Sequence, residues 1–199
     1  MSGGSGRIPV GHHAMLRAEH ELLLAFSPWT LALTTPKPDE TPPDGRPLLK
    51  NNQRITDLHH AKRMDGGTVD LTRFPSPDGY ETIWMLVADR TPPFAWTAAT
   101  CAEDGWVWFA LKNQRVLPQT LVWFSNGGRD YAPWNGRHRR AIGIEEICGY
   151  FHLGHAASIA DNPVAASGSP TAVQLKPDAP LDAAGEEVFA ACDLSFVTG

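Results

Sequence analysis

Short runs of apolar and β-branched residues, interrupted by proline, glycine and aspartate, dominate the pattern along the chain. Helices repeat their apolar positions every three to four residues, whereas half-buried strands alternate apolar with polar positions. The runs here are short, lack a helical period and end at turn residues. They predict strands at residues 21–27, 30–35, 68–74, 80–88, 94–101, 106–111, 121–124, 141–145, 171–175 and 188–196.

The runs at 94–101 and 106–111 form the clearest hairpin, because Glu103-Asp104-Gly105 separates them. Only residues 155–166 are alanine-rich enough for a helix, and Pro163 interrupts them. The spacing of the strands is typical of an antiparallel sandwich. We therefore expect an all-β antiparallel β-sandwich with minor helix. Residues 7–199 would form this single domain, after a flexible end or cloning scar at residues 1–6.

Composition narrows the class of protein. The chain has 199 residues, of which 42% are hydrophobic and 20% charged, as in a soluble globular domain. Its 17 Lys+Arg and 22 Asp+Glu give a net charge of -5, so no global positive field attracts nucleic acid. No apolar run approaches the roughly 20 residues of a membrane span, and no secretion signal opens the chain. We expect a cytoplasmic protein with neither a nucleic-acid nor a membrane partner.

The three cysteines are far apart in the sequence. Cys101, Cys148 and Cys192 lack the paired short spacing of a zinc site and are too few for a disulfide framework. We expect reduced, mostly buried thiols.

Two segments, 8–15 and 121–146, combine polar groups with nearby aromatic residues. Successive side chains of a strand point to opposite faces, so Glu145 and Glu146 must diverge, as must His12 and His13. A carboxylate in an apolar strand is costly unless it is paired or hydrogen-bonded. Glu145 is therefore either functional or a solvent-facing charge, and either histidine is functional or structural.

Gly11-His12-His13 and Gly143-Ile144-Glu145-Glu146 resemble two motifs of the galactose mutarotase-like superfamily, which includes the aldose 1-epimerases. That family places an acid histidine in a Gly-x-His-Pro-like stretch and a base glutamate in a Gly-Leu-Glu-Pro-like strand. Ala14 and Glu146 stand here in place of the prolines. The family fold is a large antiparallel supersandwich. The resemblance covers residues 7–196 and only the later part of that fold, without the family's earlier active-site histidine.

The resemblance implies a sugar mutarotase or epimerase that acts by general acid–base ring opening, without a metal or cofactor. Glu145 would be the base and His13 the acid. Trp123 or Trp134 would stack on the sugar, and Asn126 and Arg137 would supply hydrogen bonds to its hydroxyl groups. The expected partner is a small-molecule sugar or sugar phosphate.

Two charged clusters allow other interpretations. The run from Arg137 to Arg140 suits an anionic substrate group such as a phosphate, or is a solvated turn. His59 and His60 lie near Asp57, but adjacent histidines do not easily face one ion, so we expect no metal there.

Two further hypotheses stay open beside the mutarotase. In the first, the chain is a noncatalytic carbohydrate-binding module or inactive truncated homologue. In the second, it completes its sandwich by self-association. Near-continuous apolar runs such as 82–88 need a second layer to cover them, which predicts a homo-oligomer.

Overall fold

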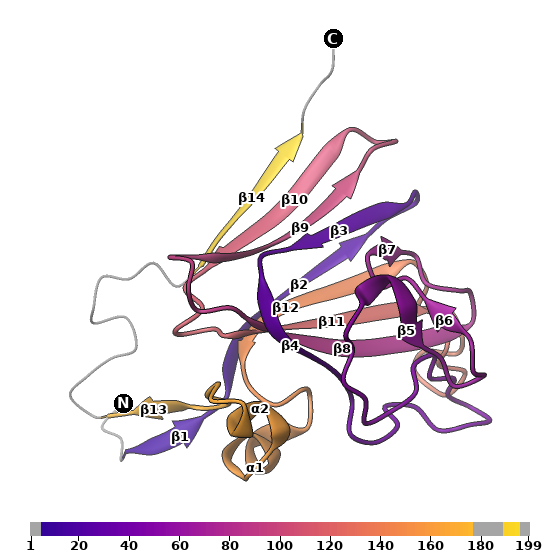
Figure 1. Cartoon of the computed structure of the whole chain (residues 1–199). Coiled ribbons are helices and arrows are strands. Elements are labelled where there is room, and N and C mark those ends of the chain that lie inside the picture. Colours follow the sequence, from indigo (N-terminus) through magenta and orange to yellow (C-terminus); the bar gives the residue numbers. More distant parts are fainter. Residues whose placement is uncertain (1–4, 177–188, 196–199) are drawn as a thin grey trace.

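The structure is a computed structural model that describes residues 5–176 and, for the backbone alone, residues 189–195 (Figure 1). The strands are β1 (Gly6–Ile8), β2 (Val10–Arg17), β3 (Leu22–Phe26), β4 (Trp29–Thr34), β5 (Ala61–Lys62), β6 (Thr68–Val69), β7 (Arg73–Phe74), β8 (Tyr80–Ala88), β9 (Ala95–Cys101), β10 (Trp106–Lys112), β11 (Gln119–Asn126), β12 (Ala141–Cys148), β13 (Val173–Leu175) and β14 (Phe189–Ser195). The helices are the 3-10 turn η1 (Leu58–His60), α1 (Gly154–Ile159) and α2 (Pro163–Ala166).

Two five-stranded antiparallel sheets form the body of the protein, in the orders β2-β12-β11-β8-β4 and β14-β10-β9-β3-β7 (Figure 1). Apolar side chains of both sheets share one buried core. Phe74 of β7, for example, meets Phe124 of β11 edge-to-face, with 5.2 Å between ring centroids. The prediction of a mostly β protein with antiparallel sheets and little helix is confirmed.

The outer face of the β2-β12-β11-β8-β4 sheet is covered at one end by the segment that follows β12. Met85 and Leu121 belong to a second buried cluster with Phe151 and with Val164 of α2. Trp84 and Leu86 belong to the core between the sheets and Met85 and Val87 to this second cluster, and residues 81–88 of β8 are all buried. This chain itself covers the apolar run at 82–88 on which the homo-oligomer was predicted.

Local hydrogen bonds split two elements that the sequence pattern predicts as continuous. The strand expected at 68–74 divides into β6 and β7, because Asp70 Oδ1 accepts hydrogen bonds from the amide and hydroxyl of Thr72 at 2.8 and 2.6 Å. Such bonds compete with the ladder of a sheet. The helix expected at 155–166 divides at Asn162, whose side chain accepts from the amide of Ala165 and caps α2.

Residues 1–4 lie outside the described residues, and Gly6 belongs to β1, where it pairs with Leu175 of β13. Cys101 and Cys148 are free and buried. The side chain of Cys192 falls outside the described part. None of the helices that the structure describes is long and apolar enough to cross a membrane.

A charged pair is enclosed between the two sheets. Glu146 of β12 is buried in the core, and its carboxylate accepts from Lys112 of β10 and from the hydroxyls of Thr97 and Thr120, each hydroxyl at 2.7 Å. The Lys112 and Glu146 side chains are each 1% exposed. Burial lowers the pKa of Lys112, and the charge and hydrogen bond of Glu146 oppose that shift. This ion pair ties one sheet to the other.

Removing one member of the pair should destabilise the fold strongly. Lys112→Met leaves the Glu146 charge unpaired in the core, which costs about 3–5 kcal/mol in comparable buried pairs. We expect that loss in the free energy of unfolding, measured by urea denaturation at pH 7. The double variant Lys112→Met/Glu146→Leu removes both charges and should regain most of it. Equal losses in the single and double variants would contradict the coupling.

Candidate functional site

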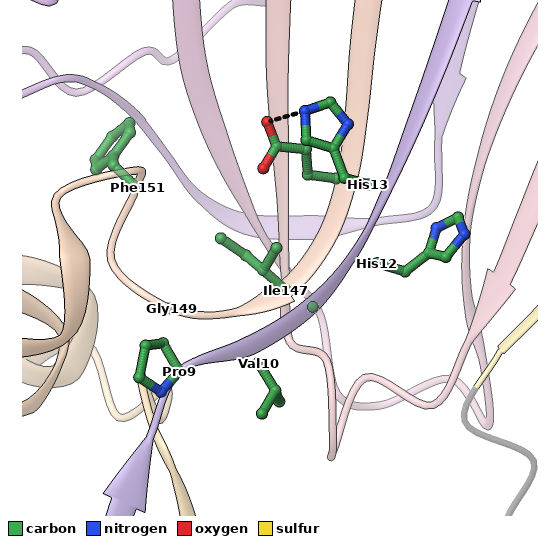
Figure 2. Close-up of a pocket in the computed structure, with 9 residues that line it drawn as sticks. Pro9, Val10, His12, His13, Ile147, Gly149 and Phe151 are labelled. Atoms are coloured by element: carbon green, nitrogen blue, oxygen red, sulfur yellow. Dashed lines mark ion pairs between the residues drawn. The ribbon is translucent and has the colours of Figure 1, made fainter.

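Adjacent antiparallel strands bring His13 and Glu145 together. His13 of β2 lies opposite Glu145 of β12 in the strand register. Their side chains meet on the outer face of the sheet, with 3.2 Å between His13 Nε2 and Glu145 Oε1. Figure 2 shows this pair, with His12 pointing away from it. The side chains are 43% and 19% exposed, so a solute can reach both.

The pair lies between two adjoining hollows, which together we call the cleft. One hollow of about 290 Å³ is lined by His13, Glu145, Ile83, Leu121, Trp123, Arg129 and His152. The other, of about 240 Å³, contains the same pair together with Gly149 and Phe151 (Figure 2). Such a concave site, with an apolar lining and a few convergent polar groups, is the usual form of a small-molecule site.

Gly143 gives the histidine ring its room. It precedes Glu145 by two residues on β12 and therefore shares its face of the sheet. A Cβ atom at Gly143 would lie 2.9 Å from Cε1 of His13 and 3.4 Å from Cε3 of Trp123. The missing side chain lets the His13 ring lie over β12.

An aromatic and cationic group forms one side of the cleft. Trp123 of β11 stacks on His138, with 5.3 Å between centroids and 20° between planes, and meets Trp134 edge-to-face at 6.1 Å. The Arg129 guanidinium carbon lies 4.7 Å from the Trp123 ring centroid and 5.0 Å from that of Trp134. These contacts hold Trp123 and Arg129 in fixed orientations.

Two buried carboxylates, Glu81 and Glu40, accept hydrogen bonds from Trp123 and Arg129. Trp123 Nε1 donates to Glu81 at 2.7 Å, and the Ser125 hydroxyl and the Gly128 amide each donate to Glu81 at 3.0 Å. Arg129 Nε donates to Glu40. Burial raises the pKa of Glu81, while its hydrogen bonds and Arg129 oppose the shift. The charge of Arg129 is thus balanced within the protein.

Burial also alters proton affinities around the cleft. It raises the pKa of Glu145, and the charge of His13 opposes this. It lowers the pKa of both His138 and His152, and the positive charge of Arg129 adds to the effect. His138 and His152 are therefore predominantly neutral at pH 7, whereas Glu145 binds a proton more readily than an exposed carboxylate does.

The structure gathers some of the residues predicted for substrate contact but not others. Trp123 lines the cleft, and Trp134 packs against it. Asn126 is buried, where its amide donates to the Ser76 carbonyl at 2.7 Å and its oxygen accepts from the Arg140 amide at 3.2 Å. Arg137 is exposed in the loop between β11 and β12 and is not among the described residues that line the cleft.

The other charged residues singled out from the sequence make local contacts. Arg139 pairs with Asp78, and Arg140 Nε donates to the Ala18 carbonyl at 2.9 Å. The neighbouring histidines of η1 face different partners: His59 contacts Asp70 at 3.1 Å, and His60 contacts Asp57 at 2.7 Å.

Sequence reasoning missed several features of the cleft. It did not select Arg129, Ile83 or His152, and it did not assign a strand to residues 10–17. Val10, Ala14 and Leu16 share one partly buried face of β2, but His12 interrupts this alternation, so the signal for a strand was weak. Arg129 lies within a segment that was singled out, but only the folded contacts with Trp123 distinguish it from the neighbouring arginines.

Comparison with protein-family models, with curated proteins and with solved structures gave no match to the chain. A function must therefore be inferred from the chemistry of the cleft. It offers a carboxylate and an imidazole in direct contact, an apolar floor, an indole and a guanidinium. This set can exchange protons with a hydroxylated ring bound against the indole.

Asp39, beside Glu40, should make stability depend on pH. Burial raises its pKa from 3.8 to about 6, and its Oδ2 has no hydrogen-bond partner among the described residues. The folded protein thus holds this proton to higher pH than the unfolded chain does. The free energy of unfolding therefore decreases as the pH rises from about 4 to about 6.

Asp39→Asn should remove this loss. We expect the variant to exceed the native protein in free energy of unfolding at pH 7 by up to about 3 kcal/mol, and by much less at pH 4. Urea denaturation at both pH values measures the difference. Asp44→Asn, at an exposed position of the same loop, controls for loss of a charge. The same difference at both pH values would contradict the assignment to Asp39.

Proposed function

We propose that the protein is a sugar mutarotase resembling the aldose 1-epimerases, built on part of a galactose mutarotase-like sandwich. The contact between His13 Nε2 and Glu145 Oε1, 3.2 Å apart in a cleft bordered by Trp123, is the observation that carries the proposal. The motifs around Gly11 and Gly143 support it, because they contain the same two residues.

Mutarotation requires a base and an acid close together. The base removes the proton of the anomeric hydroxyl while the acid protonates the ring oxygen, and the bond between that oxygen and the anomeric carbon breaks. The aldehyde then rotates, and the reverse proton transfers close the ring on its other face. Both oxygens are bonded to one carbon, so side chains at facing positions of β2 and β12 suit the reaction.

The contacts of His13 support a role as the acid. Its Nδ1 lies 3.2 Å from the Ala14 carbonyl oxygen, which only accepts, so Nδ1 carries a hydrogen. The imidazolium form would carry its second proton on Nε2, which faces Glu145 and the cleft. Burial strengthens Glu145 as a base by raising its pKa. In the proposed reaction His13 gives a proton to the ring oxygen while Glu145 takes one from the anomeric hydroxyl, and the reverse transfers at ring closure restore both groups.

The surroundings of the pair favour a neutral sugar over a sugar phosphate. Trp123 provides an aromatic wall, and Arg129 supplies donors for hydroxyl groups. The charge of Arg129 is balanced by Glu40, and the side chains of Arg139 and Arg140 are engaged in internal contacts.

A noncatalytic carbohydrate-binding module is the second candidate. The indole of Trp123 and the guanidinium of Arg129 in the cleft favour it, because both can bind a sugar without any proton transfer. Calorimetry with neutral and phosphorylated sugars, run beside a mutarotation assay, separates the two functions. Affinity without rate enhancement assigns the cleft to binding alone.

Glu145→Gln should abolish most of the mutarotation. The amide keeps the shape of the carboxylate but does not accept the proton, so we expect the rate to fall about a hundredfold or more. Polarimetry gives the rate, and calorimetry should show affinity for the sugar within a few-fold of the native value. Glu19→Gln, at an exposed residue that pairs with Arg17, is the matched control. An unchanged rate in Glu145→Gln would show that another group is the base.

Gly143→Ala tests the placement of the acid. The added methyl would lie 2.9 Å from Cε1 of His13 and should push the ring away from Glu145. We expect kcat to fall about tenfold or more with a smaller change in KM, because a displacement of about 1 Å can cost as much as a hundredfold. Gly6→Ala is the control, since its Cβ would meet nothing within 4 Å. A native kcat in Gly143→Ala would argue against a role for His13.

A further inference from the structure

A second cluster of reactive side chains lies away from the cleft, at one end of the two sheets. It combines His20, Cys101 and Asp104, whose ligand atoms all lie within 4.8 Å of one another. His20 Nδ1 is 2.8 Å from Asp104 Oδ1, and Cys101 Sγ donates to Asp104 Oδ2 at 3.2 Å. We propose that this cluster binds one zinc ion, or a divalent cation of similar ligand preference.

Two turns bring these residues together. His20 lies in the connection from β2 to β3, which passes from one five-stranded sheet to the other. Cys101 ends β9, and Asp104 lies in the turn before β10. Gly105, with a φ of 69°, adopts the left-handed conformation that this turn requires. A bound cation would cross-link two segments that are 84 residues apart at His20 and Asp104.

The ligand types select the class of cation. Calcium and magnesium take oxygen ligands, whereas thiolate with imidazole and carboxylate is a zinc set. Tetrahedral bonds of about 2.0–2.3 Å place ligand atoms about 3.3–3.7 Å apart. His20 and Cys101 contact different oxygens of Asp104, at 2.8 and 3.2 Å, and all ligand atoms of the cluster lie within 4.8 Å of one another, so small side-chain rotations would bring them to these separations. The side chains of His20 and Asp104, 44% and 38% exposed, have room to make that adjustment.

A nearby carboxylate is placed to support the histidine ligand. Glu103 Oε2 lies 3.8 Å from Nε2 of His20, whereas Nδ1 of the same ring contacts Asp104. Histidines that bind metals through one nitrogen usually donate the other N–H to a carboxylate or carbonyl, which fixes the ring. Three protein ligands leave a fourth position open to solvent. Binding converts the Cys101 thiol to a thiolate and releases its proton to the solvent.

Cobalt(II) serves as a spectroscopic probe for the zinc site in the full chain after treatment with a chelator. We expect binding of one equivalent, a thiolate-to-cobalt charge-transfer band, and displacement of the cobalt by zinc. Cys101→Ser should lose the band, and His20→Gln and Asp104→Asn should weaken cobalt binding about tenfold or more. The double variant Cys148→Ser/Cys192→Ser, which removes the other thiols, should keep the native spectrum.

Three results would each overturn the proposal. The first is the absence of a thiolate band at stoichiometric cobalt in the native chain. The second is a band that is lost in Cys148→Ser/Cys192→Ser but kept in Cys101→Ser, and the third is native cobalt affinity in both His20→Gln and Asp104→Asn. These two side chains are partly exposed, so their variants test the site even where Cys101→Ser, at a buried position, lowers stability. Urea denaturation of each variant establishes that it is folded.

Discussion

The buried pair of Lys112 and Glu146 determines which side chains of β12 point into the core and which point to the surface. Two glutamates follow each other on this strand, and a shift of one residue would exchange them between core and surface. A carboxylate in the core requires a charge partner, and Lys112 of β10 provides it with help from Thr97 and Thr120. Glu146 is held inside, and Glu145 therefore reaches the cleft. A contact between the sheets thus orients the base of the proposed reaction.

The sequence predicted the central strands well, because β8, β9 and β10 carry apolar runs between clear turn residues. It missed β2, where two adjacent histidines interrupt the apolar positions and no such run forms. Local propensity does not predict that His13 lies opposite Glu145, because this depends on the pairing of two strands far apart in the chain. Asn126 was predicted to bind sugar because it lies near Trp123 in the sequence. It is three residues from Trp123 on β11, so its side chain points to the opposite, buried face, where it hydrogen-bonds to Ser76 and Arg140.

The proposed cation site and the cleft are connected through one strand. β2 carries His13 and ends at Arg17, three residues before His20. An ion held by His20, Cys101 and Asp104 would anchor the end of β2 to the turn between β9 and β10. Cysteine spacing gave no indication of this site, since its ligands come from two turns that only the folded sheets bring together.

β2 is also the outermost strand of its sheet, paired along its length with β12 alone among the described strands. Outer elements open locally at a lower free energy than internal ones. Brief detachment of β2 would withdraw the imidazole from Glu145 while the four remaining strands stayed paired. Heating would then separate His13 from Glu145 below the melting temperature of the whole domain, and amide hydrogens of β2 would exchange faster than those of β11.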